Sequence, residues 1–270
     1  MTRYTQKSKI KEVKIRRNNT EEIVFAEIIK DPDVKIGEVA KDIALKEIKG
    51  LVAEAWGEYN SEYIRKGCIQ SYLLCIVRNK EGDLIGIAPI RKHKIFGRDI
   101  YTFGLSATTP KYQNCGVLKT MDYILGRKVL IENAIKGKFK VEFVFITPNI
   151  RTLGAIARVA DFIYPNPYMI DPKNHKIEKA DAETWRTVKK FLQEEGELYR
   201  SLDREGNIME GFYDDKPQLL FSKKITHSDK RVNDFGEYYV YKNKGRDVVV
   251  RAILNIWKVF TAKKEIPNGL

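Results

Sequence analysis

Three strand-like segments in succession constrain the fold of this chain more than any other feature. The first two, "SYLLCIVRN" (71–79) and "LIGIAPIRKH" (84–93), are rich in β-branched and apolar residues. They are joined by "KEGD", which is typical of a tight turn. A third segment, "RDIYTFGLSATTP" (98–110), ends at Pro110. Their order and short spacing predict an antiparallel meander.

Helices are predicted on both sides of this meander. Apolar residues recur at helical spacing over 36–63, and again from Gly116 to about Ile135. The second helix is followed by "KVEFVFITPN" (140–149), a β-branched and aromatic strand of the central type, and by a short helix over 150–162. We expect the buried faces of the two long helices to consist of Val39, Ile43, Leu45, Ile48, Val52 and Trp56 in the first, and Val117, Met121, Ile124, Leu125, Val129 and Ile135 in the second.

The 270 residues are enough for one elaborated domain, or for one domain with a smaller one. We divide them into a basic N-terminal arm (1–18), a core (19–172) and a C-terminal elaboration (173–270). The elaboration begins with an amphipathic helix over 181–199 and contains "DVVVRAIL" (247–254), a strand of the buried type. We expect this last strand to return to the core sheet beside the aromatic strand described above.

The charge balance is the unusual bulk property. Lysine and arginine outnumber aspartate and glutamate by 49 to 36, which gives a formal net charge of +13. The arm carries seven of these cations and, as its acid, only Glu12. Such a segment could bind nucleic acid or another polyanion through its basic surface. The alternative is a solvated arm with no specific partner.

Several classes of protein are excluded by composition. No apolar run is long enough for a membrane span, and the N-terminus lacks an apolar signal core, so we expect a soluble protein of the cytoplasm with no membrane partner. Cys68 and Cys75 are typical of small interior residues, and the three cysteines suggest neither a disulfide framework nor a metal site. The three histidines, His93, His175 and His227, are dispersed. We therefore predict no metal.

The most informative short stretch is "TTPKYQNCGVLKTM" (108–121), where a strand passes into a helix. The first N–H groups of a helix lack intrahelical partners, and the helix dipole makes that end positive. Gly116 removes a Cβ that would keep an anion away, and Asn114 tolerates the left-handed conformation. These residues predict an anion site. On the four residues "QNCG" alone, an ordinary strand-to-helix turn is the better explanation.

The wider arrangement resembles the GCN5-related N-acetyltransferase (GNAT) superfamily. "ATTPKYQNCGVLKTM" is followed, after one helix, by "FVFITPN" and another helix, and the resemblance covers about residues 36–165. The acyl-CoA loop of that family reads roughly Arg/Gln-x-x-Gly-x-Gly/Ala. Gln113 and Gly116 match its first and fourth positions, and Leu118 replaces the small sixth residue. The resemblance implies an α/β (α+β) fold with a mixed, mostly antiparallel twisted sheet flanked by helices, here extended at the C-terminus.

The resemblance also implies a set of residues that bind acetyl-CoA as the co-substrate. The backbone around Ala107 and Thr108 would pair with the pantetheine arm, and Asn149 matches an asparagine near that arm. Gln113 opens the loop that binds the pyrophosphate. The backbone amides implied in that contact are those of Asn114, Cys115, Gly116, Val117 and Leu118. A nucleophilic role for the Cys115 thiol is an alternative to a side chain that points away.

One departure from the family concerns the mechanism. Where members often have a tyrosine that protonates the departing thiolate, this chain has Ile156, and no glutamate in the meander is an evident base. Tyr112 and Tyr164 are the candidate acids or bases. The resemblance is still compatible with direct attack of a neutral amine on the thioester, accelerated by positioning and by backbone N–H groups.

Three functions remain open from the sequence. The first is an acyl-CoA-dependent N-acyltransferase, an acetyltransferase by preference, that acts on an amine acceptor. The second is a nucleic-acid-modifying enzyme with a GNAT-like fold, which the positive net charge favours. The third is a binding protein on the same scaffold without catalysis, which Ile156 and Leu118 favour.

Overall fold

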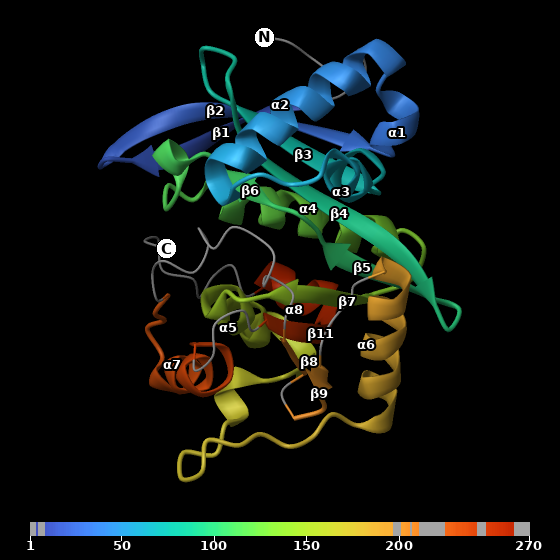
Figure 1. Cartoon of the computed structure of the whole chain (residues 1–270), viewed down its shortest axis with the longest axis vertical. Helices are drawn as coiled ribbons and strands as arrows, with labels where there is room; N and C mark the ends of the chain where they lie inside the picture. Colours follow the sequence, from blue (N-terminus) through green and yellow to red (C-terminus); the bar gives the residue numbers. More distant parts are fainter. Residues whose placement is uncertain are drawn as a thin grey trace. The chain divides into compact units, whose positions relative to one another are not determined.

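The chain folds into two compact units in a computed structural model (Figure 1). Unit 1 comprises residues 1–92 and 103–129, and unit 2 comprises residues 93–102 and 130–270. The structure describes residue 4 and residues 9–196, 201–205, 207–210, 225–241 and 247–261. The boundaries of these units differ from those expected from the sequence, which lie after residues 18 and 172. The expected boundaries stay a prediction.

Unit 1 contains an antiparallel sheet whose strands follow the order of the chain. Its members are β1 (Lys9–Arg17), β2 (Thr20–Lys30), β3 (Leu73–Arg78) and β4 (Leu84–Ile95), with the short β6 (Ala107–Thr108) paired to β4. The same unit holds α1 (Pro32–Lys35), α2 (Glu38–Trp56), α3 (Ser61–Ile64), the π-helix Arg65–Ile69 and the 3-10 turn Pro110–Tyr112. β4 continues into unit 2, as does α4 (Val117–Ala134).

Residues 9–17, within the segment 1–18 expected as a basic arm, form strand β1. Val13 lies opposite Val24 of β2, and Asn18 and Asn19 make the connecting turn with φ of 49° and 63°. Asparagine is among the few residues that adopt this left-handed conformation readily. The strand forms because charged and apolar residues alternate, so that Ile15 is buried while its cationic neighbours face outward. Of the first eight residues only Tyr4 is described.

Helix α2 covers one face of this sheet (Figure 1). Two of its expected core residues, Val39 and Ile43, are instead 79% and 47% exposed. Two sets of apolar residues in this segment recur at helical spacing, and each would form one face of the helix. The face that is buried is the one that includes the alanines. It consists of Lys41, Ala44, Ile48, Leu51, Val52 and Ala55. Small side chains let the helix approach the strands closely, so hydrophobicity alone did not identify the buried face.

Helix α4 packs on the opposite face, over Gly86 of β4. Ile87 belongs to the core under α2, so its neighbour Gly86 faces the other way. A Cβ at Gly86 would lie 3.0 Å from both Met121 Cε and Val117 Cγ1. The first turns of α4 therefore lie directly on the strand. Val117, Met121, Leu125 and Val129 are buried as expected, whereas Ile135 lies beyond the helix and is 81% exposed.

Unit 2 contains the only parallel strand pair in the described residues, β5 (Arg98–Phe103) with β7 (Lys140–Thr147). β11 (Asp247–Asn255) runs antiparallel to β7, with Val248 opposite Thr147, which agrees with the position expected for the last strand. The sheet is completed by β8 (Ala160–Tyr164), β9 (Ser201–Asp203) and β10 (Ile208–Glu210). The predicted class, mixed with mostly antiparallel strands flanked by helices, is confirmed.

The helices of unit 2 are α5, α6, α7 and α8. Their bounds are Ile150–Val159, Ala182–Glu195, Lys230–Phe235 and Ile256–Thr261, with a 3-10 turn at Pro167–Met169 and a π-helix at Gly236–Tyr241. The helix predicted over 150–162 ends at Val159, because "ADFIY" (160–164) forms strand β8. Among the described helices, none combines the length and hydrophobicity that crossing a lipid bilayer would require.

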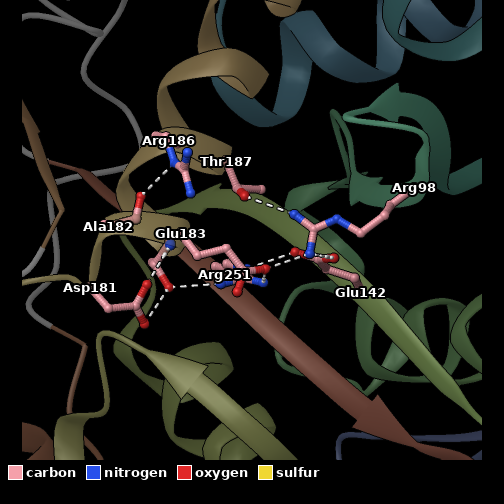
Figure 2. A network of polar contacts seen from close by, with 9 residues as sticks. Arg98, Glu142, Asp181, Ala182, Glu183, Arg186, Thr187 and Arg251 are labelled. Atoms are coloured by element: carbon pink, nitrogen blue, oxygen red, sulfur yellow. Dashed lines mark hydrogen bonds and ion pairs between the residues drawn. The ribbon is translucent and has the colours of Figure 1, made fainter.

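An ion-pair network with a buried arginine at its centre fixes the start of α6 to the strands of unit 2 (Figure 2). At its centre is Arg251 of β11, whose side chain is 4% exposed. Arg251 Nε lies 2.6 Å from Glu142 Oε1 on β7, and its Nη2 lies 2.7 Å from Glu183 Oε1 in the first turn of α6. Arg98 of β5 contacts the same two carboxylates, at 3.3 Å and 2.6 Å. Thr184 Oγ1 accepts a further hydrogen bond from Arg251 at 2.9 Å.

Candidate anion-binding site

Strand β6 leaves part of its backbone available at one edge. The N–H of Thr109 donates to the carbonyl of Ile85 on β4 at 3.1 Å. Because backbone groups alternate in direction along an antiparallel strand, the N–H and C=O of Thr108 point away from β4. No other described strand pairs with β6. The hydroxyl of Thr108 is also buried without a hydrogen-bond partner among the described residues, so this corner has two unused groups, that hydroxyl and the outward N–H of Thr108.

The chain then makes a compact turn before α4. Residues 110–112 form the 3-10 turn, after which the N–H of Gln113 donates to Pro110 O at 3.3 Å and that of Cys115 to Tyr112 O at 3.4 Å. Asn114 and Gly116 adopt positive φ angles of 61° and 81°. Both are conformations that most side chains disfavour, which explains why asparagine and glycine stand there.

Four backbone N–H groups close together at this turn have no acceptor within the described part of the chain. They belong to Asn114, Gly116, Val117 and Leu118. The next intrahelical bond begins at Thr120, whose N–H donates to Gly116 O at 2.9 Å. Helix α4 has 18 residues, so its aligned peptide dipoles add a partial positive charge at this end. Unpaired donors and a positive dipole together attract an anion.

The surface at Gly116 is open. A Cβ built there would have no protein atom within 4 Å, and Gln113, Asn114 and Gly116 are all exposed. The glycine is therefore required by its φ angle, while the space beside it remains accessible to a ligand. Lys111 and Lys119 are exposed cations on the same segment.

Two side chains of the turn fold back onto it. The amide of Gln113 donates to Thr108 O at 3.4 Å, and the Cys115 thiol lies 3.5 Å from Gln113 O. The thiol thus contacts the turn's own carbonyl, which favours a structural side chain over a nucleophile. The amide contact joins the turn to the free edge of β6.

Tyr112 is buried beneath the turn and is held by the β1–β2 hairpin. Its hydroxyl donates to Glu22 Oε1 at 2.7 Å, and Glu22 Oε2 pairs with Arg17 Nε at 2.8 Å. The guanidinium of Arg17 also lies 4.6 Å from the centre of the Tyr112 ring. Burial, followed by the hydrogen bond to Glu22, raises the pKa of Tyr112. The sequence offered no signal for Arg17 or Glu22, because both are about 90 positions away from the turn and contact it only through tertiary structure.

Asn149 and Tyr164 belong to unit 2, whereas the turn belongs to unit 1. Asn149 is the N-cap of α5, and its side-chain oxygen accepts from the N–H of Arg151 at 3.0 Å. The Tyr164 hydroxyl lies 2.8 Å from the carbonyl oxygens of Glu178 and Arg204. The contacts of these two residues within unit 2 are those of structural groups.

The candidate residues between 107 and 118 all lie in unit 1, and Tyr112 is the buried member of this group. Among the described residues, no three His, Cys, Asp or Glu side chains are grouped so that they could hold a metal ion. The candidate site itself consists of main-chain donors and one strand edge.

Comparisons with known proteins give only distant similarities. No protein-family model matches the sequence, and no curated protein matches it. Among solved structures it is similar to a GNAT family N-acetyltransferase (YhbS) from Escherichia coli in complex with CoA, at 19% identity and a TM-score of 0.32. That overlap covers 44% of this chain and 61% of the other, so the chain spans less than two thirds of that protein.

Two further structures show the same range of similarity. A GNAT family acetyltransferase from Brucella melitensis in complex with acetyl-CoA is 16% identical, with 44% of this chain and 74% of the other covered and a TM-score of 0.29. The ribosomal-protein-S18-alanine N-acetyltransferase from Escherichia coli is 10% identical, with 86% and 94% covered and a TM-score of 0.35.

Proposed function

We propose that this protein is an acyl-CoA-dependent N-acyltransferase, with acetyl-CoA as the preferred co-substrate. The observation that carries the proposal is the group of unpaired N–H donors from Asn114 to Leu118 at the positive end of α4. These donors suit a pyrophosphate. The adjacent edge of β6 suits an extended pantetheine arm, which pairs with main-chain groups as an added strand does.

Thr108 is the central residue of the proposed reaction. Its N–H, which points away from β4, would pair with the arm or donate to the thioester oxygen as negative charge develops there. The acceptor nitrogen forms a bond to the carbonyl carbon, the carbon–sulfur bond breaks, and the proton lost by the amine is matched by one gained at sulfur. The residues of the turn supply position and electrostatic stabilisation for this step.

The roles of the remaining candidates follow from their contacts. Gln113 would fix the turn against Thr108, and Cys115 would contribute its backbone only. Tyr112, which donates to Glu22, would hold the turn in place, and we assign it positioning rather than proton transfer. Tyr164 and Asn149 remain candidates, for proton transfer and for contact with the arm.

The proposal is tested by ligand-dependent stability. CoA and acetyl-CoA should each raise Tm, whereas ADP should raise it less, because a ligand that binds only the folded state stabilises it. Gly116→Val should abolish the rise. Gly97→Val is the matched control, since Gly97 also has a positive φ, 77°, and a Cβ added there would meet no other atom within 4 Å.

Two results would contradict the proposal. One is an equal rise in Tm with CoA in the wild type and in Gly116→Val. The other is the absence of any rise with either CoA species. If both CoA species bind but no free thiol is released with a panel of primary amines, the chain is a CoA-binding protein and not an acyltransferase.

A further inference from the structure

Unit 2 exposes two aromatic side chains side by side on its surface. Phe139 is 46% exposed and Trp257 is 67% exposed, with ring centroids 6.1 Å apart and ring planes within 20° of parallel. Phe139 immediately precedes β7, and Trp257 lies in the first turn of α8. Two large rings in water are unusual at one point of a folded surface, because their burial would contribute to stability.

The backbone around the two rings is well fixed. The N–H of Ile256 donates to Phe139 O at 3.0 Å, and the N–H of Trp257 donates to Asn255 Oδ1 at 3.0 Å. Asn255 also lies opposite Lys140 in the β11–β7 ladder. The rings are therefore presented by the ends of two paired strands, and their position does not depend on a long loop.

The buried residues beside the two rings are aliphatic. Beside them in sequence, Val141, Leu254 and Ile256 are between 4% and 9% exposed and face the interior. Phe139 and Trp257 keep 46% and 67% of their surface outside this core. Adjacent rings exposed to this extent indicate a surface that binds something.

Lysines flank both aromatic residues in the sequence. Lys136, Lys138 and Lys140 alternate with Gly137 and Phe139 in "KGKFK" (136–140), and Lys258 follows Trp257 directly. All four lysines are exposed. Together with Phe139 and Trp257 they form what we call the aromatic–lysine surface.

The lysines are only partly neutralised by the carboxylates that they contact. Lys140 and Lys258 share Asp161, at 3.3 Å and 4.0 Å, and Lys138 lies 3.5 Å from Asp99. Three of the four lysines thus share two carboxylates in the described contacts, and Asp99 also pairs with Lys94. The surplus is positive, so an anionic partner is favoured over a neutral one.

We propose that the aromatic–lysine surface binds single-stranded nucleic acid. Unpaired bases stack on Trp257 and Phe139, and the lysines contact the phosphates on either side, which is the general way in which such strands are held without sequence preference. A duplex would keep its bases out of reach of the rings. Lysine, a point charge on a flexible stem, suits the phosphates of a mobile strand better than the carboxylates of a folded partner, which arginine binds with a fixed fork. This binding is independent of the acyl-CoA site.

The test uses the full chain and a fluorescein-labelled oligo(dT) of about 20 nucleotides, longer than one binding fold covers. Fluorescence anisotropy should show binding that weakens as salt is added, and an equally long duplex should bind more weakly. The double variant Phe139→Ala/Trp257→Ala should lose affinity by about tenfold or more. Phe139→Tyr/Trp257→Phe, which keeps two rings, should retain it.

A second pair of variants tests the charge. Lys136→Gln/Lys138→Gln should lower the slope of log affinity against log salt by about 1.4, since each phosphate contact on a single strand contributes about 0.7. Lys46→Gln/Lys49→Gln is the control with the same change in net charge, made at two exposed lysines of α2, and should leave the slope unchanged. Circular dichroism and Tm confirm that each variant is folded.

Three outcomes would overturn the proposal. The first is no binding of the labelled strand at low salt. The second is binding that persists in the folded alanine double variant, which would mean a general cationic surface. The third is full competition by polyglutamate at the same charge concentration, which would identify an acidic protein segment as the partner instead.

Discussion

The hydroxyl of Tyr112 donates to Glu22 Oε1 at 2.7 Å and so ties the β1–β2 hairpin to the turn that opens α4. Gln113, the first residue of the turn, follows Tyr112 directly. A strand near the N-terminus therefore helps to set the conformation of a candidate binding site formed about 90 residues later. Arg17 completes the link by pairing with Glu22 and lying over the tyrosine ring.

Tyr112→Phe should weaken CoA binding with little effect on turnover at saturating CoA. The variant loses one hydrogen bond to a charged group, which corresponds to about 1.5–3 kcal/mol of unfolding free energy. Urea denaturation measures that loss, and calorimetric titration measures the affinity. A fall in turnover of about a hundredfold or more, with CoA affinity unchanged, would instead identify Tyr112 as the acid or base.

Glu22→Gln should lower the free energy of unfolding and the affinity for CoA by less than Tyr112→Phe does. An amide at this position can still accept the hydrogen bond from Tyr112, but the ion pair with Arg17 is lost. Glu21→Gln is the matched control. Glu21 pairs with Lys14 at 2.7 Å, but both side chains are more than 60% exposed, so this pair contributes little. Equal losses in the two variants, measured by urea denaturation, would mean that the hairpin does not hold the turn through Glu22.

Gly86→Ala should destabilise the protein by about 1–3 kcal/mol, because the added methyl group would lie 3.0 Å from Val117 Cγ1 under the first turn of α4. The double variant Gly86→Ala/Val117→Ala should recover part of that loss, since it removes Val117 Cγ1, one of the two atoms 3.0 Å from the added methyl group, and leaves the flexible end of Met121 to adjust. Gly50→Ala, at a helical position of α2 with nothing within 4 Å, is the control and should be stabilising by up to about 1 kcal/mol. Chemical denaturation of the four proteins is the measurement, and a Gly86→Ala variant as stable as the wild type would show that α4 can shift freely.

Local patterns predicted the elements near the candidate site well. The expected bounds of 116–135 for α4 agree with Val117–Ala134, because Gly116 and Gly137, with φ of 81° and 76°, mark the two ends of the helix. The meander and the return of β11 also followed from runs of β-branched residues. Residues 9–17 of the segment expected as a basic arm form strand β1.

The contacts that complete the site could not be predicted from sequence. Glu22 reaches Tyr112 only when the hairpin packs against the turn, and the sequence around either residue does not indicate this contact. Gly86 is similar: a glycine within a strand signals a close approach, but the sequence does not say that α4 is what approaches. Spacing determines which residues share an element, whereas tertiary packing determines which elements meet.

Asp122→Asn should stabilise the protein at pH 8. Burial raises the pKa of Asp122 to about 7, and its Oδ1 has no hydrogen-bond partner among the described residues. The folded state therefore binds the proton more tightly than the unfolded state, so stability falls as pH rises from about 4 to 7 and stays lower above that. The penalty relieved is at most about 4 kcal/mol, at about 1.4 kcal/mol per pH unit.

The measurement for Asp122 is a series of urea denaturation curves between pH 4 and pH 8. The wild type should lose stability over this range, and the variant should change less. Asp42→Asn, at an exposed position of α2, is the control and should follow the wild type. Parallel pH profiles for the wild type and Asp122→Asn would show that the carboxyl is solvated in the folded protein.

The ion-pair network of unit 2 should show strong coupling between Arg251 and Glu142 (Figure 2). Both side chains are at most 10% exposed, so Arg251→Met leaves a largely buried carboxylate without its main partner and should destabilise by about 3–5 kcal/mol. Adding Glu142→Gln should restore part of this loss, which a double-mutant cycle measures. Arg98→Met should have an effect below about 1 kcal/mol, because the Arg98 side chain is 38% exposed and its charge is screened by water. If Arg98→Met is as damaging as Arg251→Met, the strength of the network does not depend on burial of the arginine; if neither variant destabilises, the anchoring of α6 to the strands is explained by packing of Val188, Phe191 and Leu192.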